Sequence, residues 1–431
     1  MIAGRCAPVS TRIPNPPPCP PDLPMKPKIA LWFRYGLKEH ADMFPALPKI
    51  LELLVPVAEV HFYGMRTEKP IPDSLRRLVH LHQLPGRVNR NSMRDKFWKY
   101  LYWLAAIPWM ALHARLHGIQ VIYMDETLPL SVPLTQFFFG RKVATTIADM
   151  FVTMYFRGWK AALGRLIRAI DLAGWKRAAL ITTRAKNTKT WLVEQGVDAA
   201  RIRCIYDPCD FAIFHPLPAS QKAELRQQYG FGPDDFVIAH HGILHPIQGN
   251  DLLLRAFAEL LPEHPNFRFF LIGDGPEMAN LKRLRDGLGI ASACVFTGWC
   301  SSEQVCRALN AADVSLVMRI HDPTANFCIT GALVHSLACG CTTLSTRLGG
   351  PGEVVREGEN GSLFSPDDME EWKRKIVALS RDPALRVRLG HAAAETARQE
   401  FELGHVARET ADALLALCGQ SLPPVPPTST P

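Results

Sequence analysis

The sequence lacks an apolar run long enough to cross a membrane. Its longest fully apolar segment, LYWLAAIPWMAL at residues 101–112, has 12 residues and includes a proline. A bilayer-spanning helix needs roughly 18 apolar residues or more. Residues 1–27 are rich in proline and contain no apolar stretch of the kind found in secretory signals. We therefore expect a cytoplasmic protein with a disordered leader over 1–27 and a disordered tail over 419–431.

Paired cysteine motifs are also absent. The eleven cysteines are an odd number, and Cys339 and Cys341 stand two positions apart, which fits neither a redox pair nor a zinc site. Reduced thiols in a cytosolic protein explain this pattern, and we expect no metal site. No Ser-His-Asp or Cys-His arrangement can be assigned from the sequence alone.

The sequence has little excess charge of either sign. Charged residues make up 21% of the chain, hydrophobic residues 47%, and the formal net charge is +8. This composition is typical of a soluble globular protein, and the small positive excess favours contact with phosphates or anionic lipid. We expect no nucleic-acid partner. A length of 431 residues exceeds one ordinary hydrophobic core and so predicts two domains.

Two series of short apolar runs alternate with longer helical segments. The first series lies at 28–33, 58–64, 119–125, 142–149 and 178–183, and the second at 236–242, 267–273, 294–298, 314–318 and 341–346. Apolar runs without alternation are typical of parallel strands buried on both faces. The pattern predicts two doubly wound α/β domains, at 28–215 and 216–395, joined near 210–221. A last helix, 396–418, is expected to cross back to the first domain.

The stretch HHGILHPIQGNDLLLRAF, residues 240–257, is typical of a strand ending in glycine, a turn and an amphipathic helix. Such a turn usually holds an anion at the helix N-terminus. No lysine or arginine lies between Gly242 and Gly249, however. Asn250 or Asp251 is expected to cap the helix, whose apolar face is predicted from the spacing of its leucine and phenylalanine side chains. These are Leu253, Phe257 and Leu260.

Further segments carry a resemblance to a known family. They are LIGDGPEM (271–278), VFTGW (295–299), ALNAADVSL (308–316), LVHSLACGCTTLSTRLGGPGEVVREGENGSLFSPDD (333–368) and, in the first half, the run over 178–216. Together they resemble the family-4 retaining glycosyltransferases, which have the GT-B fold. The likeness covers about residues 28–405 and is strongest in the second domain.

The resemblance implies a GT-B architecture with two Rossmann-like domains that face each other across an open cleft. It implies that the second domain holds a nucleoside-diphosphate sugar and that the first domain holds the acceptor. No metal or other cofactor is expected, because basic side chains and a helix N-terminus neutralise the diphosphate in this family. Gly242 and Gly273 match glycines that shape the backbone around the donor.

This sequence departs from the family pattern at the residues that carry charge. Ile243 stands where the family has arginine, and Gln248 where it has lysine. The family also places two glutamates eight positions apart. His335 takes the position of the second, while Phe327 or, in another register, Ala325 takes that of the first. Neutral His335 retains a ring nitrogen that can accept one ribose hydrogen bond.

Other residues nearby are candidates to replace the missing groups. Arg319 ends a strand, where its guanidinium suits a diphosphate. Thr330 and Gly331 begin the next helix, whose free N–H groups favour an anion. Asn326, in the loop before that helix, is a further donor-binding candidate. Asp322 is the carboxylate closest in sequence to the first glutamate position, and it is a catalytic candidate.

Polar residues that follow strands of the first domain are candidates on the acceptor side. The segment RYGLKEH (34–40) follows the first strand, and Asp125 and Asp149 end two others. Asp149 is the catalytic candidate here, since a carboxylate in this place can orient an acceptor hydroxyl. Helix N-capping explains either aspartate equally well.

The segment over 87–118 combines cations with interfacial aromatic residues. Residues 87–99 include five Arg or Lys residues and one Asp, and the segment also carries Trp98, Trp103 and Trp109. Such a composition is typical of a helix that lies on a membrane surface, although a buried helix of the first domain has the same pattern of apolar residues. Peripheral binding to the inner membrane face suits a lipid-linked acceptor.

The leading hypothesis is a cytoplasmic glycosyltransferase of polysaccharide biosynthesis. It moves a sugar from a nucleotide donor to a glycan or lipid-linked acceptor and retains the anomeric configuration, as the resemblance implies. The alternative is a non-catalytic protein of the same fold that binds an active partner enzyme, and the missing charged residues favour it. A different GT-B enzyme, such as an epimerase or a phosphorylase, fits less well, because the likeness extends through both domains.

Overall fold

The computed structural model describes residues 26–67, 69–87, 93–124, 128–148, 156, 158–322 and 324–424. The predicted disordered leader lies outside these ranges except for its last two residues. Most of the predicted disordered tail, from residue 425, lies outside them as well.

Seven parallel strands form the sheet of the first domain, in the order β3-β2-β1-β4-β5-β6-β7. They are β1 (Lys28–Trp32), β2 (Glu59–Arg66), β3 (His80–Arg87), β4 (Val121–Met124), β5 (Lys142–Ile147), β6 (Leu180–Thr183) and β7 (Ile202–Cys204). The order reverses between β1 and β4. In a sheet of this kind, ligands bind beyond the carboxyl ends of the strands near such a reversal.

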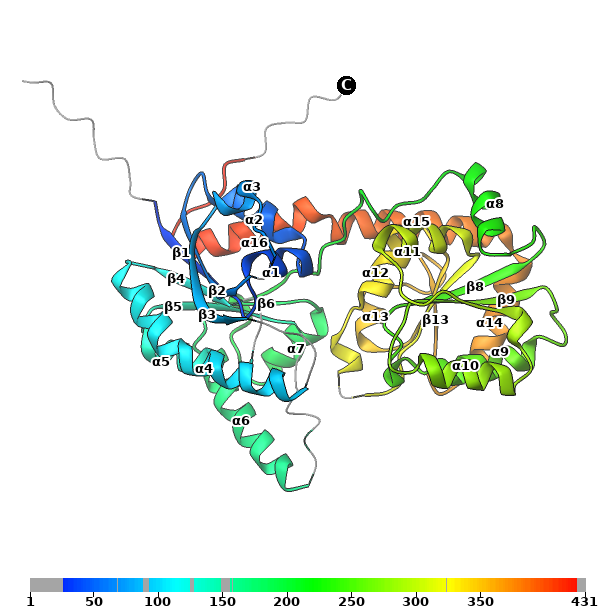
Figure 1. The fold of residues 1–431 in the computed structure, drawn as a ribbon, viewed down its shortest axis with the longest axis horizontal. Helices are drawn as coiled ribbons and strands as arrows, with labels where there is room; N and C mark the ends of the chain where they lie inside the picture. The colour runs from blue at the N-terminus through cyan, green and yellow to red at the C-terminus, as the bar shows by residue number, and fades with distance from the viewer. Residues whose placement is uncertain are drawn as a thin grey trace, which may run out of the picture.

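Helices cover both faces of this sheet (Figure 1). They are α1 (Leu37–Met43), α2 (Ala46–Leu54), α3 (Asp73–Arg76), α4 (Met93–Leu116), α5 (Ser131–Phe139), α6 (Trp159–Trp175) and α7 (Lys186–Glu194). Ile29 and Leu31 of β1 share a core with α1 to α3, whereas Ala30 and Trp32 share another with α4 to α7. Because neighbouring residues of one strand serve two cores, the strand is apolar throughout. Among the described helices, none is long and apolar enough to span a membrane.

Six parallel strands form the sheet of the second domain, in the order β10-β9-β8-β11-β12-β13. They are β8 (Phe236–His241), β9 (Phe267–Ile272), β10 (Cys294–Phe296), β11 (Val314–Val317), β12 (Thr343–Thr346) and β13 (Ser362–Phe364). The order reverses between β8 and β11, as it does between β1 and β4. The two sheets confirm the predicted pair of doubly wound α/β domains.

The helices of the second domain again lie on both faces of their sheet. They are α8 (Ala219–Gln228), α9 (Asn250–Leu260), α10 (Met278–Gly287), α11 (Ser302–Ala311), α12 (Gly331–Ala338), α13 (Gly349–Val354), α14 (Met369–Arg381) and α15 (Pro383–Phe401). Apolar side chains of α9, α10 and α14 pack into one core, and those of α12 and α15 pack into another. Two 3-10 turns, η3 (Pro246–Gln248) and η5 (Ala325–Phe327), precede α9 and α12.

The predicted cap of α9 by Asn250 or Asp251 is wrong. Gly249 is the N-cap, with φ of 58° in the left-handed region, and no side chain bonds to the free N–H groups. Glycine takes this conformation without steric cost, so the turn places Asn250 inside the helix instead of before it. The predicted apolar face is confirmed by the burial of Leu253, Phe257 and Leu260.

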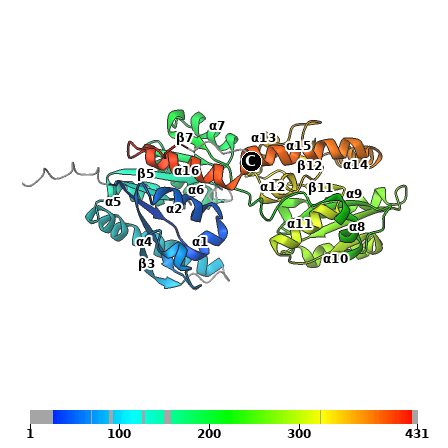
Figure 2. The ribbon, with the colours of Figure 1, turned by 90° about the horizontal axis from the view of Figure 1, so that it is seen from above.

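The chain passes between the domains twice. The first passage follows β7 and leads into α8, and the second lies at Glu402, between α15 and α16 (Leu403–Ala416). The passages are adjacent, because the Cys209 N–H donates to the Phe401 carbonyl at 2.7 Å. Figure 2 shows α15 along the second domain and α16 along the first. The predicted crossing helix therefore consists of the end of α15 and all of α16, separated by extended Glu402, whose carboxylate caps α16.

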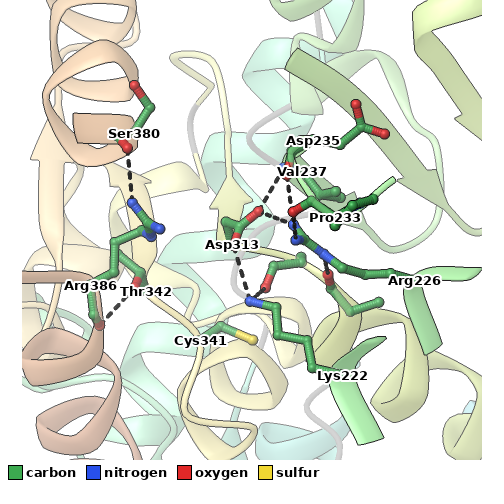
Figure 3. Close-up of polar contacts among 12 residues, drawn as sticks. Lys222, Arg226, Pro233, Asp235, Val237, Asp313, Cys341, Thr342, Ser380 and Arg386 are labelled. Carbon is green, nitrogen blue, oxygen red and sulfur yellow. Dashed lines mark hydrogen bonds and ion pairs between the residues drawn. The ribbon is translucent and has the colours of Figure 1, made fainter. Parts of the chain in front are cut away.

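Asp313, just before β11, ties α8 to the sheet of the second domain (Figure 3). Its carboxylate accepts from Lys222 Nζ at 3.0 Å, from the Val237 N–H at 2.9 Å and from the guanidinium of Arg226. Arg226 also donates to the Asp235 carbonyl at 2.8 Å. These contacts fix α8, the first helix after the interdomain passage, against β8 and β11.

A separate contact joins the domains beyond the carboxyl ends of β6 and β12. The Glu353 carboxylate accepts from the backbone N–H groups of Lys186 and Asn187 at 2.6 and 2.5 Å. These are the first two residues of α7, so a carboxylate of the second domain caps a helix of the first. Asn187 Nδ2 also donates to the Asn326 carbonyl at 3.1 Å. The loop that precedes α12 is thereby linked to the first domain.

Candidate active site

Two adjacent cavities lie at the carboxyl ends of the strands. The β8 cavity, of about 280 Å³, is lined by His240, His241, Ile243, His245, Ile247, Gln248, Val317, Met318, Arg319, Thr330 and Ala332. The interdomain cavity, of about 530 Å³, is lined by Tyr35, His40, Met43, Phe44, Ala148, Arg184, Asp207, Phe327, Cys328, Ile329, Thr330 and Gly331. Thr330 borders both, so the N-terminus of α12 separates a cavity within the second domain from one between the domains.

The backbone at the mouth of the β8 cavity depends on glycines. Gly242 and Gly273 have φ of 135° and 127°, which side chains rarely adopt. A Cβ on Gly273 would lie 2.1 Å from the Gly242 carbonyl oxygen, and one on Gly275 would lie 2.5 Å from the Leu244 backbone nitrogen. The loop after β9 therefore supports the loop after β8 by direct backbone contact. Gly242 and Gly273 thus fix the shape of these two loops, and their contact with a donor stays a prediction.

Gln248 lines the β8 cavity from the turn before α9. Its Oε1 accepts from Asn250 Nδ2 at 3.2 Å. That bond orients the amide so that Nε2 points towards Gly242, where it lies 3.2 Å from the position of an added Cβ. The Gln248 amide is thus placed beside the glycine loop as a neutral hydrogen-bond donor.

Arg319 follows β11 and reaches the β8 cavity from the opposite wall. Its side chain is almost fully buried and forms an ion pair with Asp322, with 3.1 Å between Nη2 and Oδ2. Nη2 also lies 3.3 Å from Thr324 Oγ1. Arg319 Nε, in contrast, is buried and has no hydrogen-bond partner among the described residues. The guanidinium is therefore held on one side, and one N–H group remains unpaired.

Asp322, predicted as a catalytic carboxylate, does not line either cavity. Its Oδ1 accepts from the N–H and the hydroxyl of Thr324, both at 2.7 Å, and Oδ2 accepts from Arg319. Burial raises the pKa of Asp322, but the bonds from Thr324 and Arg319 outweigh it, so the net pKa is lowered. The carboxylate is ionised and directs Arg319, and a direct catalytic role stays a prediction that this packing does not favour.

The N-terminus of α12 faces both cavities. Thr330 is the N-cap, and its hydroxyl accepts from the Leu333 N–H at 3.2 Å. Gly331 follows as the first helical residue and borders the interdomain cavity. Asn326 lies away from this N-terminus: its Oδ1 accepts from the Gly349 N–H at 2.9 Å, so its side chain joins the η5 loop to α13. It lines neither cavity.

His335 lies one turn into α12, behind the β8 cavity. Its ring stacks on Phe214 of the interdomain passage, with centroids 3.8 Å apart and planes inclined by 6°. The ring of His241 lies 5.9 Å away on the other side. Burial lowers the pKa of His335 to about 4, so the ring is neutral near neutral pH. His335 contacts the back of the site and is not among the residues that line the cavity.

The interdomain cavity contains residues of the predicted acceptor side. Tyr35 and His40, from the segment that follows β1, line it. Ala148 also lines it, and Asp149, the next residue and a predicted catalytic carboxylate, lies outside the described residues, as does Asp125. Arg184 forms an ion pair with Asp207 within the cavity wall. The carboxyl ends of β1, β5 and β6 thus open onto one space.

Three of the eight predicted donor residues line the β8 cavity. They are Gln248, Arg319 and Thr330, whereas Asn326 and Asp322 line neither cavity and bond to other residues. The sequence reasoning missed four polar residues that line the two cavities: His240, His241, Arg184 and Asp207. The signal for the two histidines was their position at the end of a strand that precedes a glycine turn. Arg184 follows β6 in the same way.

Comparison with known proteins identifies the second domain. Residues 221–396 match the family described as glycosyl transferases group 1. The second domain is therefore similar to the group 1 glycosyl transferases. The match includes the whole β8 cavity and α12, so the residues described above occupy the part of the chain that this family defines.

Two curated relatives illustrate the activities described for proteins similar to this chain. Over 218 residues the chain is 32% identical to the D-inositol 3-phosphate glycosyltransferase of Acidothermus cellulolyticus. The aligned region covers 47% of this chain and 46% of that protein. The chain thus spans about half the length of that relative. Over 354 residues it is 24% identical to the N-acetyl-alpha-D-glucosaminyl L-malate synthase of Bacillus anthracis, with 80% of this chain and 85% of that protein covered.

Solved structures share the two-domain arrangement. Anabaena HepE, crystallised in complex with UDP, superposes with a TM-score of 0.69 and 18% sequence identity over 91% of this chain and 100% of that chain. WaaG, a glycosyltransferase involved in lipopolysaccharide biosynthesis, superposes with a TM-score of 0.65 and 16% sequence identity over 90% of this chain and 99% of that chain. At these identities the likeness concerns the fold, which is that of the GT-B enzymes.

Proposed function

We propose that the chain is a retaining glycosyltransferase of the family-4 type, which transfers a sugar from a nucleoside-diphosphate donor to a glycan or lipid-linked acceptor. The observation that carries this proposal is the adjacency of the two cavities. A cavity in the glycosyl transferase domain holds a glycine loop, an arginine and a helix N-terminus, and it adjoins a second cavity between the domains. Donor and acceptor therefore have neighbouring places with Thr330 between them.

The proposed roles follow from the chemistry of the leaving diphosphate. Transfer develops negative charge on the diphosphate, and fixed N–H groups and cations stabilise such charge. We assign this role to Arg319 and to the N-terminus of α12, with Gln248 as a neutral donor and Gly242 as the point of close backbone approach. The proposal therefore includes no resident metal. His335 is assigned to the donor ribose, and Asp149 to the acceptor hydroxyl.

The comparisons support this proposal through what relatives do. HepE has been crystallised with UDP-glucose, and the two relatives named above are described as a D-inositol 3-phosphate glycosyltransferase and an N-acetyl-alpha-D-glucosaminyl L-malate synthase. A uridine diphosphate sugar is therefore the first donor to test. Purified protein should show an increase in Tm with one member of a panel of nucleotide sugars, and slow release of the nucleoside diphosphate with that donor. A panel without any thermal shift would contradict the proposed donor site.

A second candidate is a non-catalytic protein that binds a nucleotide sugar or a partner enzyme. The observation that favours it is the ion pair of Arg319 with Asp322. Among the described residues that line the β8 cavity, Arg319 is the only arginine or lysine, and Asp322 already neutralises part of its charge. A thermal shift without turnover, in the presence of crude glycan and lipid extracts, would favour this candidate over the enzyme.

We also propose peripheral contact with an anionic membrane. Large apolar side chains are exposed on the face formed by α4, α5 and α6, which pack side by side. They are Phe97, Trp98, Leu101, Tyr102, Trp109, Leu112 and Leu116 on α4, Phe137 and Phe138 on α5, and Leu163, Leu166 and Ile170 on α6. Trp103, predicted to take part, is instead buried in the core of the domain. Exposed apolar surface of this extent, with one lysine and two arginines on α6, suits a lipid interface.

A further inference from the structure

The β8 cavity contains buried polar atoms that the fold itself leaves without partners. Neither ring nitrogen of His241 has a hydrogen-bond partner among the described residues, and only 3% of its surface is exposed. The same holds for Arg319 Nε. An unpaired buried polar group costs about 1–3 kcal/mol of stability, and such groups are normally satisfied by protein, water or ligand. His241 and Arg319 both line the β8 cavity, and this shared position indicates a polar ligand there.

The charges around His241 come from few groups. Among the described residues, the titratable and charged groups near it are His240 on the same strand, His245 in the turn, His335 on α12, and Arg319 after β11, which is paired with Asp322. Burial, followed by repulsion from His335 and His240, holds the pKa of His241 well below its usual value. Both His241 and His335 are therefore neutral in the empty site at neutral pH.

We propose that donor binding takes up a proton onto the His241–His335 pair, so that an imidazolium supplies the positive charge that lysine and arginine supply in related loops. This inference rests on the proposed function. A diphosphate in the β8 cavity carries negative charge next to His241, and a neighbouring anion favours the charged form of a titrating group. In this step the protein binds the donor and takes up one proton from solvent, so that the complex carries one more positive charge than the free protein and donor together.

One proton is expected and not two, because the two rings lie 5.9 Å apart and two imidazolium groups at that distance repel. The sign of the pH dependence follows. Binding raises the pKa of the pair, so the gain in affinity is complete below the pKa of the empty site and is lost as pH rises through the pKa of the complex. Donor affinity should therefore strengthen as pH falls from neutral, by about tenfold for each unit by which binding raises the pKa.

The test is isothermal titration calorimetry of the full chain with nucleotide sugars. These donors carry no group that titrates near neutral pH, so every proton counted comes from the protein. The probes are the diphosphate sugars of uridine, guanosine, adenosine and thymidine, titrated at several pH values in buffers with different ionisation enthalpies. The expected result is a dependence of the observed enthalpy on the buffer, equivalent to uptake of up to about one proton, together with a Kd that decreases towards lower pH.

The variants H241N and H335N keep a polar side chain but cannot titrate, and together they should abolish the proton uptake. H391N is the matched control: His391 lies on α15, lines a different cavity and should leave the uptake unchanged. Binding without proton uptake by the wild-type protein overturns this inference and leaves the proposed function standing. Absence of binding for every donor at every pH overturns both. The wild-type result decides even where a variant does not fold.

Discussion

Replacing Arg319 tests whether its charge serves the donor or only the fold. Arg319 and Asp322 are both almost fully buried, with 9% and 8% of their side chains exposed. Removing one partner of a buried ion pair costs about 3–5 kcal/mol, because it leaves the other charge uncompensated. In R319Q the Asp322 carboxylate keeps its two bonds from Thr324. We therefore expect the free energy of unfolding to decrease by about 3 kcal/mol, the lower limit of that range, as measured by chemical denaturation.

The double variant R319Q/D322N separates stability from binding. It removes both charges, so most of the lost stability should return, because replacing a buried pair as a whole is often close to neutral. Donor affinity should not return. A charged hydrogen bond to a ligand contributes about 1.5–3 kcal/mol, which corresponds to a roughly 10- to 150-fold increase in Kd. Calorimetric titration with the donor measures this change in the single and the double variant.

The control is R347Q. Arg347 lies after β12 and forms an ion pair with Glu371 that is half exposed on the arginine side. Exposed pairs contribute about 0–1 kcal/mol, so this variant should change stability little and donor affinity not at all. If the double variant binds the donor as tightly as the wild type, the role of Arg319 is confined to the fold. The non-catalytic candidate then becomes the better account of the chain.

Three further predictions concern other parts of the molecule. G273A should lose about 1–3 kcal/mol of stability or more, because the added Cβ meets a backbone carbonyl at 2.1 Å and φ is 127°, whereas G287A, whose Cβ meets nothing, should be neutral in the same unfolding assay. Burial raises the pKa of Asp171 to about 6 from 3.8. As pH rises from 4 to 6, the free energy of unfolding of the wild type should therefore fall by up to about 3 kcal/mol relative to that of D171N, as measured by denaturation at each pH. Serine at both Trp98 and Trp109, which are 60% and 51% exposed, should lower partition onto anionic vesicles roughly tenfold or more, and unchanged sedimentation would contradict the membrane proposal.

The sequence predicted the central strands of both sheets, since strands buried on both faces are apolar along their whole length. It missed β3, β7 and β13 for physical reasons. β3 and β7 are edge strands of the first sheet and β13 is an edge strand of the second. Edge strands have fewer buried neighbours, and β3 includes histidines and a proline that weaken any pattern. The formation of these three edge strands thus depends on pairing with a neighbouring strand, which the local sequence does not reveal.

The candidate site was predictable where its role depends on backbone shape and less so where it depends on side-chain contacts. Gly242 and Gly273 follow strands in a recognisable turn. The ion pair of Arg319 with Asp322 has an ordinary three-residue spacing, but its burial depends on how the η5 loop folds back. The role of Asn326 as a link to α13 depends on a residue 23 positions away. Contacts of this kind require the fold to be known first.

The residues that remain in this site favour a site that still binds a ligand over one that has lost that function. The glycines alone do not decide the matter, because backbone contacts such as that of Gly273 with Gly242 are needed for the fold whether or not a ligand binds. The unpaired polar atoms of His241 and Arg319 differ, since folding does not require them and each costs about 1–3 kcal/mol. Apolar residues of similar volume would remove that cost in a protein that no longer binds a donor. A cavity lined by two residues with such atoms, beside the interdomain cavity, is therefore better explained by a ligand that satisfies them.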